Sequence, residues 1–334
     1  MDRKQAEIRI SELREILWEN SRKYYVDNAP TMSDYDYDHL MYELEAIEKE
    51  YPDLVTPDSP TMRVGSDLEN RTQTGKVLVG AKKEFAQVPH KYPMLSLGNT
   101  YSIGEVEDFV ARASKSVSEP FSFSCELKFD GTAICLTYIG DDVTDNVRKI
   151  SNIPVRLKGS GYPDEFEIRG EILMPYESFD RLNKERIDNE EAPFANPRNA
   201  ASGSLKLLDP EEVGRRGLWC TLYHIPSPDI KFATHGDAMR AAASWGLPIS
   251  DKSRICRGIN EIEEYISYWD KERKFLPFAT DGIVIKINEL EIQTRLGYTS
   301  KFPRWAVAYK FQAERALTKL ESIDYQVGRT GAVT

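Results

Sequence analysis

The chain has 334 residues, a formal net charge of −10 at pH 7 and 40% hydrophobic residues. This length allows more than one domain, and the composition is that of an ordinary globular protein. The polar start and the absence of long apolar runs argue against a secretory signal and a membrane span, so a cytoplasmic protein is expected. The acidic balance argues against strong nucleic-acid binding by this chain alone. The four cysteines are widely spaced, which predicts neither zinc nor disulfides.

Residues 4–51 carry apolar side chains at helical spacing in two stretches. Between these stretches lies a segment rich in tyrosine and aspartate, residues 24–38, in which Ser33 and Asp36 have the spacing of a helix-capping box. Two interpretations stay open for this segment. The tyrosines pack on the core around a capped helix start, or they form a platform of aromatic faces and carboxylates that binds a small molecule. Residues 52–93 are rich in turn residues and read as a connector.

Residues 121–138 alternate with period two, so that Phe123 and Leu127 point one way while Glu126, Lys128 and Asp130 point the other. Gly131 then allows a turn, and residues 133–138 are expected to run back as the second strand of a hairpin. By itself the motif favours an ordinary half-solvated hairpin. A strand that presents a nucleophile is the alternative.

Strand and helix patterns alternate irregularly in the rest of the chain, which predicts an α+β domain with antiparallel sheets. No Gly-x-Gly-x-x-Gly or Walker-type loop is present, so a dinucleotide-binding Rossmann unit and a P-loop are disfavoured. Strands are expected at 165–174, 218–224, 282–288 and 304–311, and helices at 176–189, 237–245 and 259–274.

Lysines interrupt several of these apolar strands. Lys286 lies in an almost fully apolar strand, and Lys310 shares a face with two alanines that leave room for a ligand. Each lysine alone is best explained as a snorkelling side chain on an edge strand. Together with Lys128, Arg169 and Glu171, they suggest a shared polar pocket suited to a phosphate. Desolvation and nearby cations activate lysine nucleophiles, so such a pocket could support covalent chemistry at Lys128.

The chain resembles the bacterial NAD+-dependent DNA ligases in their N-terminal helical and adenylation domains, from about residue 5 to its end. The resemblance rests on many motifs in the order of that family, and Lys-x-Asp-Gly is only one of them. The motifs are the segment 24–38, Thr-Pro-Asp-Ser-Pro-Thr at 56–61, Pro-Met-Leu-Ser-Leu at 93–97, Glu-Leu-Lys-Phe-Asp-Gly at 126–131, Arg-Gly-Glu at 169–171, Phe-Ala-Asn-Pro-Arg-Asn-Ala-Ala at 194–201, Asp-Gly-Ile-Val-Ile-Lys at 281–286, Trp-Ala-Val-Ala-Tyr-Lys-Phe at 305–311 and Val-Gly-Arg-Thr-Gly at 327–331.

This resemblance implies a nucleotidyltransferase core of the ATP-grasp-like ligase type. In it, Lys128 attacks the α-phosphorus of NAD+, carries AMP and releases nicotinamide mononucleotide. The implied catalytic residues are Lys128, Asp130, Lys286, Lys310 and Arg198. The implied cofactor-binding residues are Tyr24, Tyr25, Asp34, Tyr37, Asp38, Ser96, Leu97, Glu126, Glu171, Arg273, Asp281, Lys286 and Lys310. In these roles, Glu126 contacts the adenine, Glu171 holds the ribose or acts through Mg2+, and Asp281 supports the metal or the lysines. Mn2+ is an alternative metal, and no zinc is implied.

The implied domains are a helical nicotinamide-mononucleotide-binding unit at 1–68, an adenylation domain at 69–318 and the start of an OB-fold at 319–334. The partners are NAD+ and nicked duplex DNA, the latter bound weakly by this chain, which is expected to be a monomer. One departure is that Tyr138 leads directly to residues 139–144, where the family has a longer hairpin. The alternatives are an ATP- or GTP-dependent nucleotidyltransferase and a non-catalytic NAD-binding module.

Overall fold

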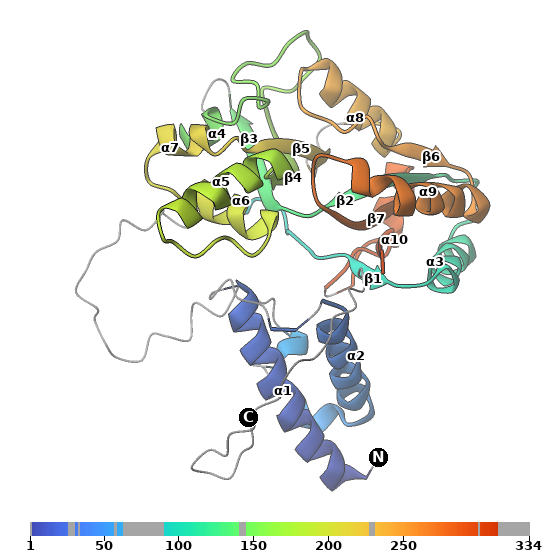
Figure 1. Ribbon diagram of the computed structural model, residues 1–334. Coiled ribbons are helices and arrows are strands. Elements are labelled where there is room, and N and C mark those ends of the chain that lie inside the picture. The colour runs from blue at the N-terminus through green and yellow to red at the C-terminus, as the bar shows by residue number, and fades with distance from the viewer. Residues whose placement is uncertain are drawn as a thin grey trace. The chain divides into compact units, whose positions relative to one another are not determined.

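The computed structural model describes residues 2–25, 31–32, 34–56, 59–62, 90–139, 145–226, 231–299 and 301–312. The chain divides into two compact units, residues 1–89 and 90–334, and each is considered by itself (Figure 1). The sequence boundary expected between residues 68 and 69 and the OB-fold start expected at 319–334 both lie outside the described residues. Among the helices of the described part, none combines the length and apolarity that a membrane crossing requires.

The first unit is a pair of helices, α1 (Arg3–Tyr25) and α2 (Asp34–Glu50), followed by the short 3-10 turns η1 (Pro52–Leu54) and η2 (Pro60–Met62). Their apolar faces meet in a core that includes the fully buried Leu13, Leu17 and Leu44. Glu48 is buried beside this core and accepts hydrogen bonds from Arg14 (2.6 Å) and from Ser59 (2.6 Å). The helical pattern is thereby confirmed over residues 4–25 and 34–50.

The second unit contains a five-stranded sheet in the order β1-β8-β7-β2-β6. The pair β1–β8 is parallel, whereas the other neighbours are antiparallel, so the expected antiparallel pairing is confirmed except at this edge. The strands are β1 (Gly98–Thr100), β2 (Phe123–Phe129), β6 (Arg254–Cys256), β7 (Thr280–Ile287) and β8 (Ala306–Lys310).

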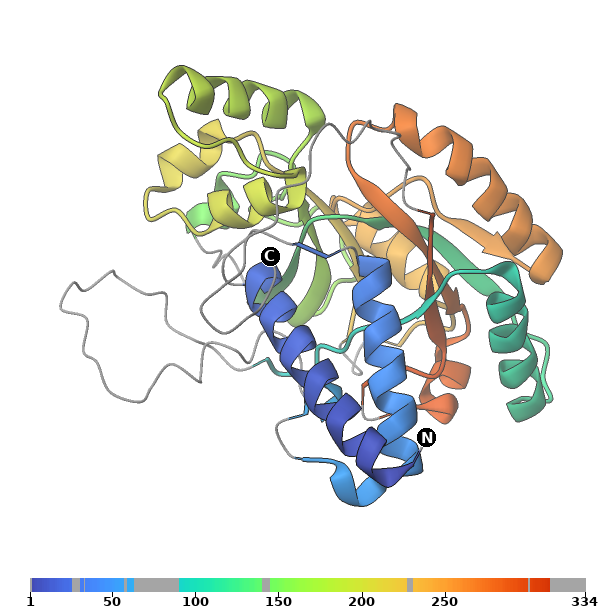
Figure 2. The same cartoon turned by 60° about the horizontal axis from the view of Figure 1, so that its bottom comes forward.

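Helices cover the apolar face of this five-stranded sheet. α3 (Ile103–Ser116) and α9 (Ile259–Glu272) lie side by side along it, in teal and orange in Figure 2. Phe109 of α3 and Ile262 of α9 pack with Phe123, Cys125 and Ile285 of the sheet in one cluster of buried residues. α10 (Leu290–Leu296) follows β7, and η4 (Arg273–Phe275) follows α9.

A three-stranded antiparallel sheet, in the order β3-β4-β5, forms the second half of this unit. Its core is built around Phe166, Ile168, Ile172 and Leu222, each at most 2% exposed. The strands are β3 (Thr132–Ile139), β4 (Glu165–Leu173) and β5 (Trp219–His224), and the helices of this half are α4 (Asp145–Arg148), α5 (Tyr176–Asp188), α6 (Pro197–Leu205), α7 (Pro210–Arg215) and α8 (His235–Ser244).

The hairpin expected at residues 121–138 is not formed, although both of its strands are. β2 pairs with β7 and β6, while β3 pairs with β4 in the other sheet. At the junction, an added Cβ on Gly131 would lie 2.3 Å from the backbone oxygen of Ile172, so only glycine lets the chain cross between the sheets here. The motif therefore links two sheets instead of turning back on one.

The remaining strand and helix expectations are confirmed to within a few residues at each end. The protein is a mixed α+β protein with helices, one mixed sheet and one antiparallel sheet.

Candidate active site

Three neighbouring strands place lysines on one face of the five-stranded sheet. In the register of β2, β7 and β8, Lys128 and Lys310 both lie opposite Gly282, and Lys286 lies opposite Ser124. Because side chains alternate along a strand, Lys128 shares this face with Glu126, whereas Leu127 between them faces the helices. At Gly282 an added Cβ would lie 2.0 Å from the backbone oxygen of Tyr309, so the close approach of β8 at this point requires glycine.

Asp281 joins two of these lysines. Lys128 Nζ donates to both carboxylate oxygens, at 2.9 and 3.1 Å, and Lys310 Nζ lies 3.4 Å from Oδ2. The register of β2 against β7 shifts between Lys128 and Phe129, directly beside Asp281. The lysines are 24% and 13% exposed, so solvent or a ligand can still reach them. One carboxylate thus holds two ammonium groups at the end of the strands.

A second pair of charges stands where the chain leaves β2. Arg198, at the start of α6, donates to Asp130 Oδ1 at 3.0 Å. The helix start is fixed by Asn196, whose side chain accepts from the backbone N–H of Asn199. Burial raises the pKa of Asp130, although Arg198 opposes this shift. The Arg198 guanidinium therefore stabilises the charged form of a largely desolvated carboxylate, Asp130, at the end of the strand that carries Lys128.

Glu171 of β4 adds a carboxyl group whose pKa lies near neutral pH. Burial raises its pKa to about 7, against the opposing effect of Arg198 and Lys128 and with support from the nearby charges of Asp130 and Asp281. Tyr223 on β5 donates its hydroxyl to Glu171 Oε2 at 3.4 Å. The neighbouring Gly170 is again a close approach, since an added Cβ would lie 2.2 Å from the backbone oxygen of Thr221.

The elevated pKa of Glu171 predicts a pH-dependent loss of stability. Its folded pKa of about 7 exceeds the ordinary value of 4.5, so its contribution is most favourable below pH 4.5 and is lost as the pH rises from 4.5 through 7. Glu171→Gln removes this dependence. We expect urea unfolding to show that, between pH 4.5 and pH 8, the free energy of unfolding of the variant rises relative to that of the wild type by on the order of 3 kcal/mol. A constant difference between the two proteins across this range would contradict the assignment.

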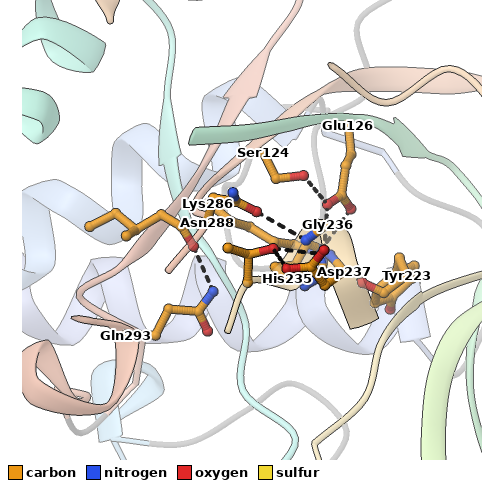
Figure 3. A network of polar contacts seen from close by, with 11 residues as sticks. Ser124, Glu126, Tyr223, His235, Gly236, Asp237, Lys286, Asn288 and Gln293 are labelled. Atoms are coloured by element: carbon orange, nitrogen blue, oxygen red, sulfur yellow. Dashed lines mark hydrogen bonds and ion pairs between the residues drawn. The ribbon is translucent and has the colours of Figure 1, made fainter. Parts of the chain in front are cut away.

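A separate buried network surrounds Glu126, two residues before Lys128 (Figure 3). Lys286 Nζ donates to Glu126 Oε2 at 2.8 Å and to the backbone oxygen of Tyr223 at 2.9 Å. His235 Nε2 lies 2.7 Å from Glu126 Oε1, and Ser124 Oγ donates to the same oxygen at 2.9 Å. Burial alone would raise the pKa of Glu126, but Lys286 and His235 hold it well below its usual range. Glu126 is therefore an ionised acceptor.

His235 and Tyr223 are the members of the site that sequence reasoning missed. His235 is 2% exposed, and burial and the charge of Lys286 lower its pKa, so the ring is neutral at neutral pH. A lone histidine at a helix start carries no local signal of a partner more than a hundred residues away. Tyr223 lies in a strand that the sequence pattern did predict. The pattern could not show that this strand pairs with β4 and so brings Tyr223 to Glu171.

Other expected site residues lie outside the charged groups around Lys128 and the network around Glu126. Arg273 packs its guanidinium over the ring of Phe311 at 4.7 Å, next to Lys310 in the chain, and lies 3.5 Å from the backbone oxygen of Thr280. Ser96 is exposed, and Leu97 packs on the core of the five-stranded sheet just before β1. Arg169 anchors the start of this segment, because its guanidinium donates to the backbone oxygens of Tyr92 and Pro93.

The tyrosine-rich segment of the first unit is described in part. Tyr37 packs against the helical core, and its hydroxyl lies 2.7 Å from Ser21 Oγ. Asp38 is half-buried on α2. The side chains of Tyr24, Tyr25 and Asp34 and the whole of Ser33 lie outside the described residues, so the platform and the capping box stay predictions.

The carboxylates offer limited support for a metal ion. In the described part of the chain, no group of three or more His, Cys, Asp or Glu residues is arranged to hold one. Glu171 and Asp281 could each supply an oxygen ligand. Since Mg2+ is often bound through one or two carboxylates with substrate phosphates and water, the donor set fits a metal that arrives with its substrate.

Taken together, the described site can hold a phosphate-bearing ligand and attack it with an amine. Lys128 is an amine that a ligand can still reach, while Lys310 and Arg198 supply positive charge close to it. Glu126 offers a fixed hydrogen-bond acceptor farther along the same strand face.

Comparison with known proteins agrees with this chemistry. The profile of the family described as NAD-dependent DNA ligase adenylation domain matches residues 82–314, and the profile described as DNA ligase-like, N-terminal NAD+-binding domain matches residues 3–65. Proteins named DNA ligase from Parabacteroides distasonis and Bacteroides fragilis are 51% and 50% identical over 98% of this chain, which covers 50% and 49% of their lengths. A DNA ligase from Cytophaga hutchinsonii is 44% identical over the full chain and 50% of its own length.

The chain thus spans about half the length of the curated relatives it matches. Both matching profiles fall in the order that the sequence motifs predict, and the adenylation profile alone covers more than half of the chain. The chain belongs to the family of NAD-dependent DNA ligases and contains its N-terminal NAD+-binding and adenylation domains.

Proposed function

We propose that this chain carries out self-adenylation with NAD+ as the AMP donor. The neutral amine of Lys128 attacks the α-phosphorus, the phosphorus–oxygen bond to the pyrophosphate bridge breaks, and nicotinamide mononucleotide leaves. The product is AMP joined to Lys128 through a phosphoramidate bond. The observation that carries this proposal is the placement of Lys128 and Lys310 on the single carboxylate of Asp281.

The proton of Lys128 has a ready acceptor in this arrangement. Asp281 accepts from Lys128 Nζ through both of its oxygens, so it is the group nearest to the proton that must leave before attack. Lys310 shares Oδ2 with Lys128, and incoming phosphate oxygens would compete for its ammonium. Binding of the phosphates would then draw Lys310 away from Asp281 and strengthen that carboxylate as a proton acceptor.

Positive charge is also needed where negative charge grows in the transition state. Lys310 is paired with Asp281, which also holds Lys128, and Arg198 is paired with Asp130, two residues after Lys128. Phosphoryl transfer is accelerated mainly by positioning and by such electrostatic stabilisation. A Mg2+ ion held by Glu171 and Asp281 would add charge neutralisation when bound. Glu171 also stands ready to accept a ribose hydroxyl.

The finer features of the family extend this proposal. The core would be of the ATP-grasp-like ligase type, with Arg273, Ser96 and Leu97 lining the nucleotide site. In the first unit, Tyr24, Tyr25, Asp34, Tyr37 and Asp38 would bind the nicotinamide mononucleotide half. The adenylated protein would pass AMP to the 5′-phosphate of nicked duplex DNA in a cytoplasmic, monomeric enzyme that serves replication and repair. The net charge of −10 predicts that this chain binds nicked DNA only weakly.

The test is to incubate the chain with Mg2+ and NAD+ labelled in its adenylate, and separately with labelled ATP. We expect a covalent adduct of one AMP and an equal amount of free nicotinamide mononucleotide from NAD+, and no adduct from ATP. Label transfer from ATP alone would favour an ATP-dependent nucleotidyltransferase. Tight NAD+ binding without any adduct would favour a non-catalytic module.

A further inference from the structure

His235 is a buried polar side chain to which the proposed reaction gives no part. Its backbone N–H donates to the backbone oxygen of Asn288 at 2.6 Å, and the N–H of Gly236 donates to Asn288 Oδ1 at 2.9 Å. The first turn of α8 is therefore tied to the end of β7, the strand that carries Lys286 (Figure 3). A ring held this firmly is suited to fix the orientation of a partner.

That partner is Glu126, and its acceptor sites are almost filled. His235 and Ser124 take Oε1, and Lys286 takes Oε2. A carboxylate has about four lone-pair positions in all, so one remains, on Oε2. Lys286 Nζ also lies 3.4 Å from His235 Nε2, but the contact of Nε2 with Glu126 is much shorter, at 2.7 Å. Because an ionised carboxylate can only accept, this shorter contact assigns a ring proton to Nε2. Glu126 is 12% exposed and can touch a ligand, whereas His235 at 2% cannot.

We propose that His235 is a positioning residue that determines base specificity, because it holds Glu126 as a pure acceptor for the 6-amino group of adenine and thereby excludes 6-oxo purines. This inference rests on the proposed use of NAD+. Glu126 and Lys128 are two residues apart on one strand face, which separates them by about 7 Å. That spacing leaves room for a ribose between the nucleophile at the phosphorus and the group that reads the base.

The discrimination follows from the charge on Glu126. The oxygen of a 6-oxo purine would face the carboxylate of Glu126, and because both groups only accept, no hydrogen bond could form between them. Lys286 and His235 together keep the pKa of Glu126 low, so the carboxyl group has no proton to offer such an oxygen. Without His235, Glu126 loses one of its fixed partners, can turn about Lys286, and is more easily protonated. A protonated Glu126 donates to a 6-oxo group, so the preference for adenine would shrink.

The experiment compares adduct formation from NAD+ with that from nicotinamide hypoxanthine dinucleotide, the 6-oxo analogue, as a ratio of kcat/KM values. We expect the wild-type chain to prefer NAD+ by at least about 100-fold. His235→Phe keeps a ring but removes the donor and should lower the preference by about tenfold or more. His235→Gln can place an amide N–H near the position of Nε2 and should retain the preference to within about threefold.

A matched control is His224→Phe. The His224 ring stacks against that of His235 with centroids 6.3 Å apart, but it is not among the three donors to Glu126. This variant should change stability and leave the base preference intact. If His235→Phe does not fold, His235→Leu supplies the test, because it removes the ring donor with a smaller side chain and should reduce the preference to a similar extent.

The outcomes separate the two proposals. Failure of the wild-type chain to form an adduct with NAD+ would overturn the proposed function. A wild-type chain that forms the adduct, together with a folded His235→Phe variant that keeps the wild-type preference, would overturn only the role of His235. A preference that falls equally in His235→Phe and His224→Phe would also overturn it, because that result reports general disturbance of the core.

Discussion

Lys128→Arg is expected to abolish formation of the AMP adduct while the fold is retained. Arginine keeps a positive charge opposite Asp281, which now holds Lys128 through two contacts of 2.9 and 3.1 Å. Its guanidinium stays protonated at any accessible pH and has no lone pair to offer a phosphorus atom. Loss of the nucleophile removes the covalent route altogether, so the rate should fall by at least about a thousandfold.

Intact-mass spectrometry after incubation with NAD+ measures this effect directly. Lys271→Arg is the matched control, since Lys271 is an exposed residue of α9 on the far side of the sheet from the lysine cluster. It should form the adduct at the wild-type rate. An adduct on folded Lys128→Arg, mapped by peptide analysis to Lys310 or Lys286, would show that the nucleophile had been assigned to the wrong strand.

The sequence was sufficient to single out several residues that the structure brings together, because part of the signal is local. A charged side chain in an apolar strand stands out from its neighbours, and Lys128, Lys286 and Lys310 were each identifiable in this way. Period-two alternation also indicated the correct face for Glu126 and Lys128. These inferences depend on residues only a few positions apart, where chain geometry is nearly fixed.

The sequence pattern could not show which lysine pairs with which carboxylate. Asp281 and Lys128 are 153 positions apart, and Lys286 and Glu126 are 160 apart, so strand register decides which lysine meets which carboxylate. The hairpin prediction failed for the same reason. A Gly after a strand permits a turn, but the choice between returning to the same sheet and crossing to another depends on which partner strands, β7 and β4, are available.

Lys286→Met is expected to destabilise the unit of residues 90–334 by about 3 to 5 kcal/mol, the usual effect of removing one partner of a buried ion pair. Lys286 is 6% exposed, and its ammonium satisfies both Glu126 and the backbone oxygen of Tyr223. Methionine fills a similar volume, so the loss is electrostatic and not a matter of packing. It leaves an ionised carboxylate that water can barely reach.

Urea unfolding followed by tryptophan fluorescence provides the measurement, since four of the five tryptophans, at positions 219, 245, 269 and 305, lie in this unit. Lys271→Met, at the exposed site on α9, should change the free energy of unfolding by no more than about 0.5 kcal/mol. A similar small change for Lys286→Met would mean that Glu126 is solvated or protonated in the folded protein, contrary to its place in the network.

The double variant Glu126→Gln/Lys286→Met separates stability from function. A neutral amide can still accept from His235 and Ser124 and needs no counter-ion, so about half of the lost stability should return. Adduct formation from NAD+ should stay strongly reduced, because the fixed carboxylate acceptor is gone. The half that returns measures the penalty of leaving Glu126 charged and unpaired, and it is not net stabilisation by the pair. Recovery of folding without recovery of activity would therefore show that the Glu126–Lys286 pair is kept for nucleotide chemistry, whereas recovery of both would show that it is only structural.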